Sequence, residues 1–228
     1  MRTERGTQAA RVSAPMDRRP ISLRDLGWVR AIAAQLVHMG VKPNHISILG
    51  VGFAAVSAIC LFLVPAAEPA TRTLLLIGAA AFIPFRGLCN LCDGLMAIEG
   101  GQRSSSGEIF NDLPDRVSDS LLLVSAGYAI PGVAWMPELG WLAALLAALT
   151  AYVRVLGAAA GAAQQFGGPM AKTHRMVVMA GAFLASAMES AAAAPPRAIC
   201  VGLAVVVVGS AITIVRRTAR VLRELDAR

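Results

Sequence analysis

Six long apolar segments constrain the fold of this chain more than any other feature of its sequence. They lie at residues 46–64, 73–98, 108–130, 139–163, 175–191 and 199–215. A helix that crosses a bilayer needs about 20 predominantly apolar residues, and each segment is close to that length. Only 15% of the 228 residues are charged, whereas a soluble domain has roughly a quarter. The sequence therefore predicts an all-α fold, an integral membrane bundle of six transmembrane helices.

Positive charge predicts how this bundle is oriented. Residues 1–43 carry eight Lys and Arg side chains and residues 216–228 carry five, and further cations lie in the loops after the second and fourth segments. Cytoplasmic loops of membrane proteins are enriched in Lys and Arg, so both termini and these loops are expected in the cytoplasm. The formal net charge of +7 also suits contact with anionic membrane lipids. The cations are dispersed over helix ends rather than gathered on one face, which argues against nucleic acid as a partner.

The remaining segments differ from the bundle in composition. Residues 1–20 are polar and Arg-rich, which predicts a disordered basic tail. Residues 21–40 place apolar side chains at helical spacing with arginines between them, which predicts an amphipathic helix along the membrane interface. A short soluble helix without membrane contact is the alternative. Residues 41–220 are then the six-helix transmembrane domain, and residues 221–228 are a cytoplasmic tail.

Polar side chains gather where the second apolar segment ends and the third begins. Asn90 and Asp93 share one helix face, on which Gly94 and Ala97 are small enough to leave room. The next segment repeats oxygen-bearing side chains at every fourth position. These are Asn111, Asp115 and Asp119, with Asp112 in the same wide arc. The two faces can converge across adjacent antiparallel helices.

These oxygen-bearing side chains predict a metal site at one membrane face. Oxygen ligands without Cys or His favour Mg²⁺, Mn²⁺ or Ca²⁺ over zinc. Mg²⁺ is usually held by one or two carboxylates and completes its shell with water and substrate phosphates, which indicates phosphate chemistry. The alternative is that these residues only hydrogen-bond between helices, as Asn and Asp do in other membrane bundles. Their number, their small neighbours and their common face favour the site.

The same residues carry a resemblance to a known family. The run resembles the signature of the CDP-alcohol phosphotransferases, D-x2-D-G-x2-A-R-x8-G-x3-D-x3-D, and keeps every spacing through Gly107 to Asp115. Pro43-Asn44 followed by Ser47 is similar to a second family feature at the start of the first membrane helix. The six-helix count and the interfacial helix also resemble the family, so the likeness covers nearly the whole chain.

Three positions depart from that signature. Asn90 and Asn111 stand where the family has its first and third Asp, and Ile98 replaces the Arg. The resulting Asn/Asp/Asn/Asp pattern resembles a bacterial subfamily, which implies the bacterial inner (cytoplasmic) membrane as the location. The two amides also remove two formal negative charges, so the site holds less cation charge than four carboxylates would.

The resemblance implies a metal-dependent transferase of phospholipid biosynthesis. The hydroxyl of an acceptor alcohol would attack the β-phosphorus of CDP-diacylglycerol or another CDP-linked lipid, a phosphodiester would form, and CMP would leave. The metal ligands, for one or two Mg²⁺ or Mn²⁺ ions, would be Asn90, Asp93, Asn111 and Asp115. Asp115 would also be the catalytic general base, with Asp112 and Asp119 as additional carboxylates. The nucleotide would bind at Asn44, Ser47, Asn90, Asp93, Gly94, Ala97 and Gly107. Relatives of this kind are often homodimers.

Further cations are expected near these residues. Residues 167–175 form a Gly/Pro loop that leads into the fifth segment, where Lys172 and Arg175 suit phosphate binding. The alternative for this loop is the ordinary positive flank of a membrane helix. Arg154 lies within the fourth segment, where an unpaired guanidinium would be costly, so it either pairs with a motif carboxylate or contacts substrate phosphate.

Two functions from different classes follow from these observations. The first is an active phosphotransferase that uses a CDP-linked lipid. The second is a non-catalytic relative that binds nucleotide or lipid, or serves as a partner subunit, and the lost carboxylates motivate it. A divalent-cation transporter is disfavoured because the charges stop at one membrane face.

Overall fold

All regular secondary structure in the described part of the chain is helical. The computed structural model describes residues 27–99, 107–130, 132–194 and 197–227. Within these ranges there are seven α-helices, one short 3-10 helix and no β-strand. The helices are α1 (Gly27–His38), α2 (Pro43–Leu63), α3 (Pro69–Glu99), α4 (Gly107–Tyr128), α5 (Met136–Ala159), α6 (Lys172–Ala191) and α7 (Arg197–Asp226), with η2 (Val64–Ala66) directly after α2. The all-α prediction is confirmed.

Helices α2 to α7 cover the six apolar segments, but three boundaries differ from the predicted ones by four residues or more. α3 begins at Pro69, and proline suits the first turn of a helix. α5 ends at Ala159, four residues earlier than predicted, and Gly161 follows with a φ of 102°, which side chains other than glycine rarely adopt. α7 continues to Asp226, through the predicted tail, because its inward face stays buried as far as Val221.

Four helices of the described chain are long and apolar enough to cross a membrane, judged by length and composition. They cover Pro43–Ala66, Pro69–Ala97, Met136–Ala159 and Arg197–Asp226. α4 and α6 were also predicted to span the membrane, but charged side chains occupy the first turns of both helices. A count of six transmembrane helices therefore stays a prediction.

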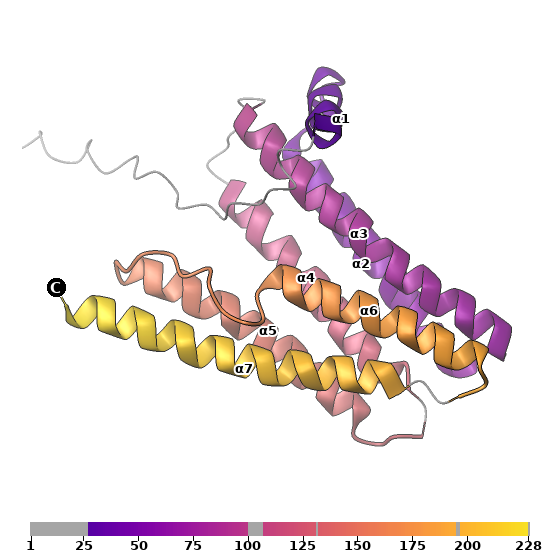
Figure 1. The fold of residues 1–228 in the computed structure, drawn as a ribbon. Helices are drawn as coiled ribbons and strands as arrows, with labels where there is room; N and C mark the ends of the chain where they lie inside the picture. Colours follow the sequence, from indigo (N-terminus) through magenta and orange to yellow (C-terminus); the bar gives the residue numbers. More distant parts are fainter. Residues whose placement is uncertain (1–26, 100–106, 131, 195–196, 228) are drawn as a thin grey trace, which may run out of the picture.

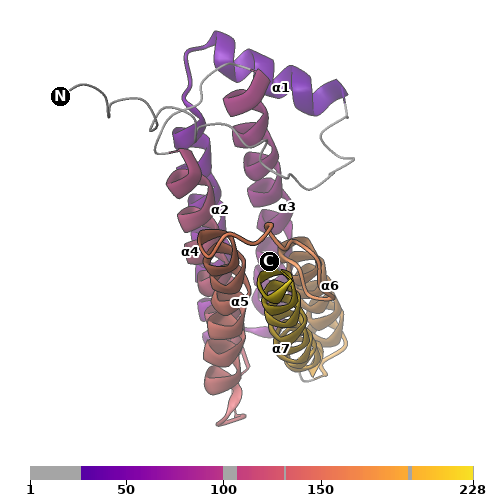
Figure 2. The same cartoon turned by 90° about the vertical axis from the view of Figure 1, so that its left-hand side faces the viewer.

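The helices pack as neighbours in a bundle with α1 across one end. α2 and α3 lie side by side, and α1 contacts α3 near its C-terminal end (Figures 1 and 2). α4 packs against α2 and α5, α6 packs against α3, and α7 packs against α5 and α6. α3 and α4 touch each other over a short stretch only. The polar ends of these two helices can therefore border a common pocket.

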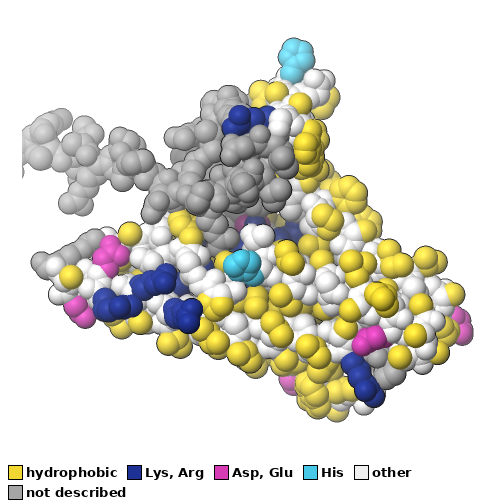
Figure 3. Space-filling model, in the orientation of Figure 1, with side chains coloured by type: hydrophobic (Ala, Val, Ile, Leu, Met, Phe, Trp, Pro, Cys, Tyr) yellow, Lys and Arg dark blue, Asp and Glu magenta, His cyan; other side chains and the backbone are white. Residues whose placement is uncertain are grey.

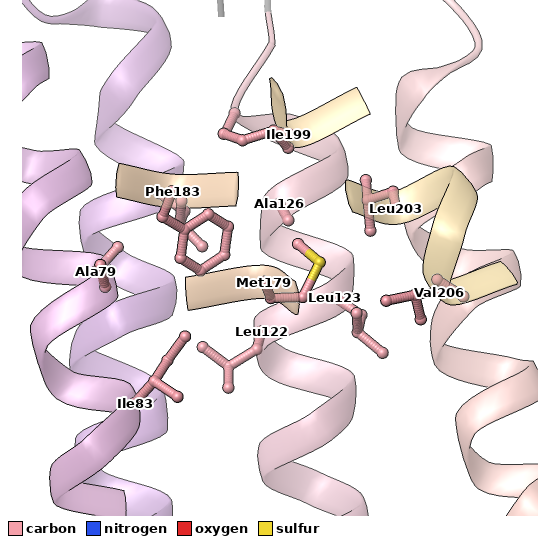
Figure 4. Close-up of a cluster of buried hydrophobic side chains, with 14 of the residues drawn as sticks. Ala79, Ile83, Leu122, Leu123, Ala126, Met179, Phe183, Ile199, Leu203 and Val206 are labelled. Carbon is pink, nitrogen blue, oxygen red and sulfur yellow. The ribbon is translucent and has the colours of Figure 1, made fainter. Parts of the chain in front are cut away.

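One hydrophobic cluster fills the centre of the bundle (Figure 4). Met179 and Phe183 of α6 are fully buried between side chains of three other helices. Those side chains are Ala79 and Ile83 of α3, Leu122, Leu123 and Ala126 of α4, and Ile199, Leu203 and Val206 of α7. This core fixes the position of α6 relative to α3 and α4.

Two glycines allow a close approach of α4 and α5. A Cβ added to Gly127 would lie 2.7 Å from the carbonyl oxygen of Met136 and 3.1 Å from the Cα of Gly140. A Cβ at Gly140 would lie 2.8 Å from the carbonyl oxygen of Leu123. Small residues of this kind let membrane helices pack backbone against backbone.

Many large apolar side chains lie on the outer surface. Hydrophobic side chains are spread over the face in Figure 3, and dark-blue cations gather at the end where α7 finishes. Leu74, Trp141, Met188 and Val215 are each more than half exposed. An apolar belt this extensive is unfavourable in water and suits the hydrocarbon of a bilayer.

Helix α1 falls inside the stretch predicted to be amphipathic. Val29 and Ala33 are buried against the C-terminal end of α3, whereas Trp28 and Ile32 are exposed. Residues 21–26 and the predicted tail at 1–20 lie outside the described residues. The helix is confirmed from Gly27, and its place at the membrane interface stays a prediction.

Candidate functional site

A small pocket lies where α2, α3 and α4 meet, with room for about one water molecule. Its lining comes from three helices: Ser47 and Gly50 of α2, Arg86, Cys89, Asn90 and Asp93 of α3, and Pro114, Asp115 and Ser118 of α4. Gly50 permits α2 to approach, because a Cβ there would already be 3.3 Å from that of Cys89. The fold thus brings together Asn90, Asp93 and Asp115, which are 25 residues or fewer apart in the sequence but come from two helices.

Asp93 is buried with one oxygen unsatisfied. Its side chain accepts a hydrogen bond at Oδ2 from the Ser47 hydroxyl, at 2.7 Å. Its Oδ1 is buried and has no hydrogen-bond partner within the described residues, and the residue is only 4% exposed. A buried carboxylate oxygen without a partner is costly, so this atom is a favourable place for a bound cation.

Asp115 has partners on both carboxylate oxygens. The Asn90 amide donates to Oδ1 at 2.8 Å, and the Arg86 guanidinium lies 3.3 Å from the same oxygen. The Lys172 ammonium, from the first residue of α6, forms an ion pair with Oδ2. Arg116 lies 4.0 Å from Oδ2 and is more exposed. Asp115 is therefore neutralised by cations from α3 and α6.

Asp119 joins three helices through buried ion pairs. Arg86 of α3 lies 2.9 Å from its Oδ1, and Arg175 of α6 lies 2.8 Å from its Oδ2. Arg175 is 1% exposed and also donates to the hydroxyl of Thr150 and the carbonyl of Met170. Paired and hydrogen-bonded guanidinium groups of this kind tolerate burial, whereas single ones do not. Asp119 and Arg175 thus fix α6 against the wall of the pocket.

Arg154 was predicted to pair with a motif carboxylate or to contact substrate phosphate, and it pairs with Asp112, a carboxylate next to the signature position Asn111. Its Nη2 lies 2.6 Å from Oδ1 of Asp112, and its Nη1 donates to Gln164 at 3.2 Å. The guanidinium also lies 5.3 Å from the centre of the Phe166 ring, within range of a cation–π contact. This cluster borders the loop that connects α5 to α6.

The connecting loop, residues 160–171, is held by α7. Arg217 is 3% exposed and donates to the backbone carbonyls of Thr150, Phe166 and Gly167. The Thr213 hydroxyl accepts a hydrogen bond from the backbone N–H of Met170 at 3.0 Å. These contacts determine where the loop ends, and therefore where α6 begins.

Comparison with known proteins gives a match in structure. No protein-family model and no curated protein matches the sequence. The Mycobacterium tuberculosis phosphatidylinositol phosphate synthase, in a crystal structure with manganese and citrate, is similar with a TM-score of 0.69 and 23% identity over 85% of this chain and 88% of that chain. The two chains share a fold. The same protein with CDP-DAG bound has a TM-score of 0.67 and 22% identity, over 86% of this chain and 92% of that chain. Its apo form has a TM-score of 0.67 and 23% identity, over 84% of this chain and 95% of that chain.

The other predicted site residues lie near the pocket but outside its lining. Asn44 is in the first turn of α2, Gly94 and Ala97 are in the last turns of α3, and Gly107 begins α4. The side chains of Asn111 and Ile98 lie outside the described part of the structure, although both residues are helical.

Arg86 is the residue that the sequence analysis missed. It precedes Asn90 by one helical turn and so shares its face, and it contacts both Asp115 and Asp119. A signal was present, because a charged residue inside an apolar helix usually faces the bundle interior and pairs there. Met176 was also missed, and its sulfur accepts a hydrogen bond from Arg86 at 3.1 Å.

The described donors offer one buried, unpartnered carboxylate oxygen to a divalent cation. Asp93 offers a buried, unpartnered oxygen, and Asn90 lies beside it on the pocket wall. Asp115 is already occupied by Asn90, Arg86 and Lys172. Among the described residues, no three His, Cys, Asp or Glu side chains come together as a ligand group. A single Mg²⁺ or Mn²⁺ would therefore take most of its shell from water and phosphate, as Mg²⁺ commonly does.

Proposed function

We propose that this protein is a membrane phosphotransferase of phospholipid biosynthesis. It transfers a substituted phosphate group from a CDP-linked lipid, such as CDP-diacylglycerol, to the hydroxyl of an alcohol and releases CMP. The observation that carries this proposal is the pocket, whose lining includes both Asp93 of α3 and Asp115 of α4, two residues of the signature. The fold supports it as well, because the phosphatidylinositol phosphate synthase that shares this fold binds CDP-DAG.

In this proposal Asp115 is the general base and Asp93, with Asn90 and Asn111, holds the divalent cation. A bound cation would stabilise the negative charge that develops on the pyrophosphate as CMP leaves. In the structure the Lys172 ammonium occupies Oδ2 of Asp115. The phosphate of the substrate offers Lys172 a second anionic partner. Movement of Lys172 from Asp115 to that phosphate would leave Oδ2 of Asp115 open to the hydroxyl of the alcohol when the substrate is in place.

Small residues next to the pocket give the nucleotide room. Gly94 and Ala97 follow Asp93 on α3, and Gly107 begins α4, so no large side chain from these positions projects between the helices. Asn44 and Ser47 belong to the first turns of α2, on the same side of the bundle. We assign the cytidine nucleotide to this region. Ser47 has a further role, because it orients Asp93 by the hydrogen bond to Oδ2.

The proposal also places the protein in the membrane. Helices α2 to α7 would cross the bacterial cytoplasmic membrane, α1 would lie along its interface, and both termini and the pocket would face the cytoplasm. The apolar surface of the bundle and the cations at the end of α7 support this placement. The small residues that let helices of this bundle pack closely are also compatible with a homodimer.

CMP release tests the proposal directly. Purified protein in detergent is incubated with CDP-diacylglycerol, Mg²⁺ or Mn²⁺ and a pool of candidate alcohols. We expect release that needs the cation and one of the alcohols. The Asp93→Ala variant should lose at least about 100-fold of this rate, whereas Asp226→Ala, at the exposed end of α7, should retain it. Release that persists in Asp93→Ala, or no release with any alcohol, would contradict the proposal.

A non-catalytic relative is the second candidate, and the cations on Asp115 favour it. A carboxylate that is permanently paired with Lys172 and Arg86 would bind ligands without acting as a base. Such a protein would bind CDP or CDP-diacylglycerol and release no CMP. The two candidates are separated by measuring nucleotide binding and CMP release on the same preparation. If only binding is found, Asn90→Asp and Asn111→Asp are the substitutions that would restore the signature.

A further inference from the structure

The charges around the pocket leave no negative excess that would attract an ion. Three carboxylates, each at most 9% exposed, lie among two buried guanidinium groups and the partly exposed ammonium of Lys172. The members of this group are Asp93, Asp115, Asp119, Arg86, Lys172 and Arg175. Four ion pairs connect five of them. The sixth member, Asp93, forms no ion pair with the described residues. These six charges cancel, and Arg116, 4.0 Å from Oδ2 of Asp115, adds a positive charge at the exposed edge of the group.

This balance determines what the pocket can bind. A divalent cation alone would leave two positive charges in a poorly hydrated site, which is unfavourable. A pyrophosphate alone would leave an excess of negative charge in the same place. The two together cancel. A neutral site therefore takes the cation and the pyrophosphate as a pair more readily than either one.

We propose that this site has no resident metal, and that one divalent cation binds at Asp93 only together with the pyrophosphate of a nucleotide-linked lipid. The inference rests on the proposed function, because that lipid is the proposed donor. One cation is expected rather than two, because only one carboxylate of the pocket has an oxygen without a partner. The unpartnered buried oxygen belongs to Asp93, whereas Asn90, Arg86 and Lys172 already surround Asp115.

Lys172 occupies the place that a second cation would otherwise take. Its ammonium meets Oδ2 of Asp115, on the side of the carboxylate away from Asn90. It comes from the start of α6, at the end of a glycine-containing loop, so it can reach the pocket from a separate helix. Removing this charge should make the pocket attractive to a metal ion without nucleotide.

Titration with Mn²⁺ followed by electron paramagnetic resonance tests the inference. Detergent-solubilised protein is titrated alone and with saturating CDP-diacylglycerol, and protein-free samples with the same lipid correct for the Mn²⁺ that the lipid itself holds. We expect the affinity for Mn²⁺ to rise at least about tenfold with the lipid, with one ion bound per chain. Equal affinity without the lipid, or two ions per chain, would overturn the inference.

Charge variants sharpen the test. Lys172→Met should strengthen Mn²⁺ binding to the lipid-free protein by about tenfold or more. Lys42→Met is the matched control, because Lys42 is exposed at the start of α2, and it should leave that affinity unchanged. Asn90→Asp adds a negative charge to the pocket wall and should act in the same direction, so the test stands if one variant does not fold. Unchanged affinity in both pocket variants would contradict the inference.

The outcomes separate this inference from the proposed function. If CDP-diacylglycerol binds and Mn²⁺ binds equally well without it, the inference fails and the transferase proposal stands. If the lipid does not bind, with or without Mn²⁺, both fail. Isothermal titration with CDP in place of the lipid gives the nucleotide affinity independently of the metal signal.

Discussion

The buried pairs of Asp119 predict that its loss is far more damaging than the loss of Asp112 on the same helix. Asp119→Asn removes the carboxylate between Arg86 and Arg175, at 2.9 Å and 2.8 Å, and both guanidinium groups are at most 3% exposed. Breaking a buried ion pair by removing one partner costs about 3–5 kcal/mol, because the remaining charge is left uncompensated. For a chain of this size, each kcal/mol lowers the melting temperature by about 2–4 °C. We expect a decrease of about 10 °C or more.

Asp112→Asn is the matched control. Its pair with Arg154 is shorter, at 2.6 Å, but the Asp112 side chain is 34% exposed and the Arg154 side chain 18%. Pairs in contact with solvent contribute about 0–1 kcal/mol, so the melting temperature should fall by at most about 4 °C. Thermal unfolding in one detergent, followed by circular dichroism, compares the two variants. Equal decreases in melting temperature, or a larger decrease for Asp112→Asn, would refute the argument that burial determines the strength of an ion pair. They would favour the argument that the distance between the charged groups alone determines it.

Three further predictions concern packing, the loop and the metal. Gly127→Ala should destabilise the protein by about 1–3 kcal/mol, because its Cβ would lie 2.7 Å from the carbonyl of Met136. Gly181→Ala, which meets nothing within 4 Å, should be neutral or slightly stabilising, and the reverse order in thermal unfolding would contradict this reasoning. Gly168→Ala should lower CMP release, because Gly168 has a φ of 143° and an added Cβ would collide with Thr213. Thr213 holds the loop before Lys172 by a hydrogen bond to Met170. An unchanged rate would mean that the loop does not position Lys172. Chelation with EDTA should abolish CMP release and added Mg²⁺ or Mn²⁺ should restore it, whereas full activity in EDTA would exclude a metal-dependent transfer.

Sequence length and spacing predicted the parts of the structure that depend on local physics. Apolar segments of membrane length became helices, and their ends were correct within four residues except for the C-terminal end of α7. Asn90, Asp93 and Asp115 share a pocket because helical periodicity puts the first two on one face and antiparallel packing brings the third opposite. Gly161 ended α5 earlier than hydropathy indicated, since backbone conformation rather than polarity determines that boundary.

The ion-pair network could not be predicted in the same way. Arg86 finds its partners 29 and 33 residues away on another helix, and Asp119 finds Arg175 56 residues away. Spacing within one helix carries no information about such pairs, because they depend on how α3, α4 and α6 are arranged. The sequence indicated only that a charge inside an apolar helix needs a partner. The charge balance of the pocket is a property of the assembled bundle.

The length of α7 affects the loop between α5 and α6. Its 30 residues make a rod of about 45 Å at helical rise, longer than the roughly 30 Å of bilayer hydrocarbon. Its last third carries Arg217, whose guanidinium donates to the carbonyls of Gly167 and Phe166 in the loop before α6, and Glu224, whose carboxylate accepts from the backbone N–H of Ala163 in the same loop. The last turns of α7 thus hold the loop before α6 by hydrogen bonds, and this loop determines where Lys172 lies relative to the pocket.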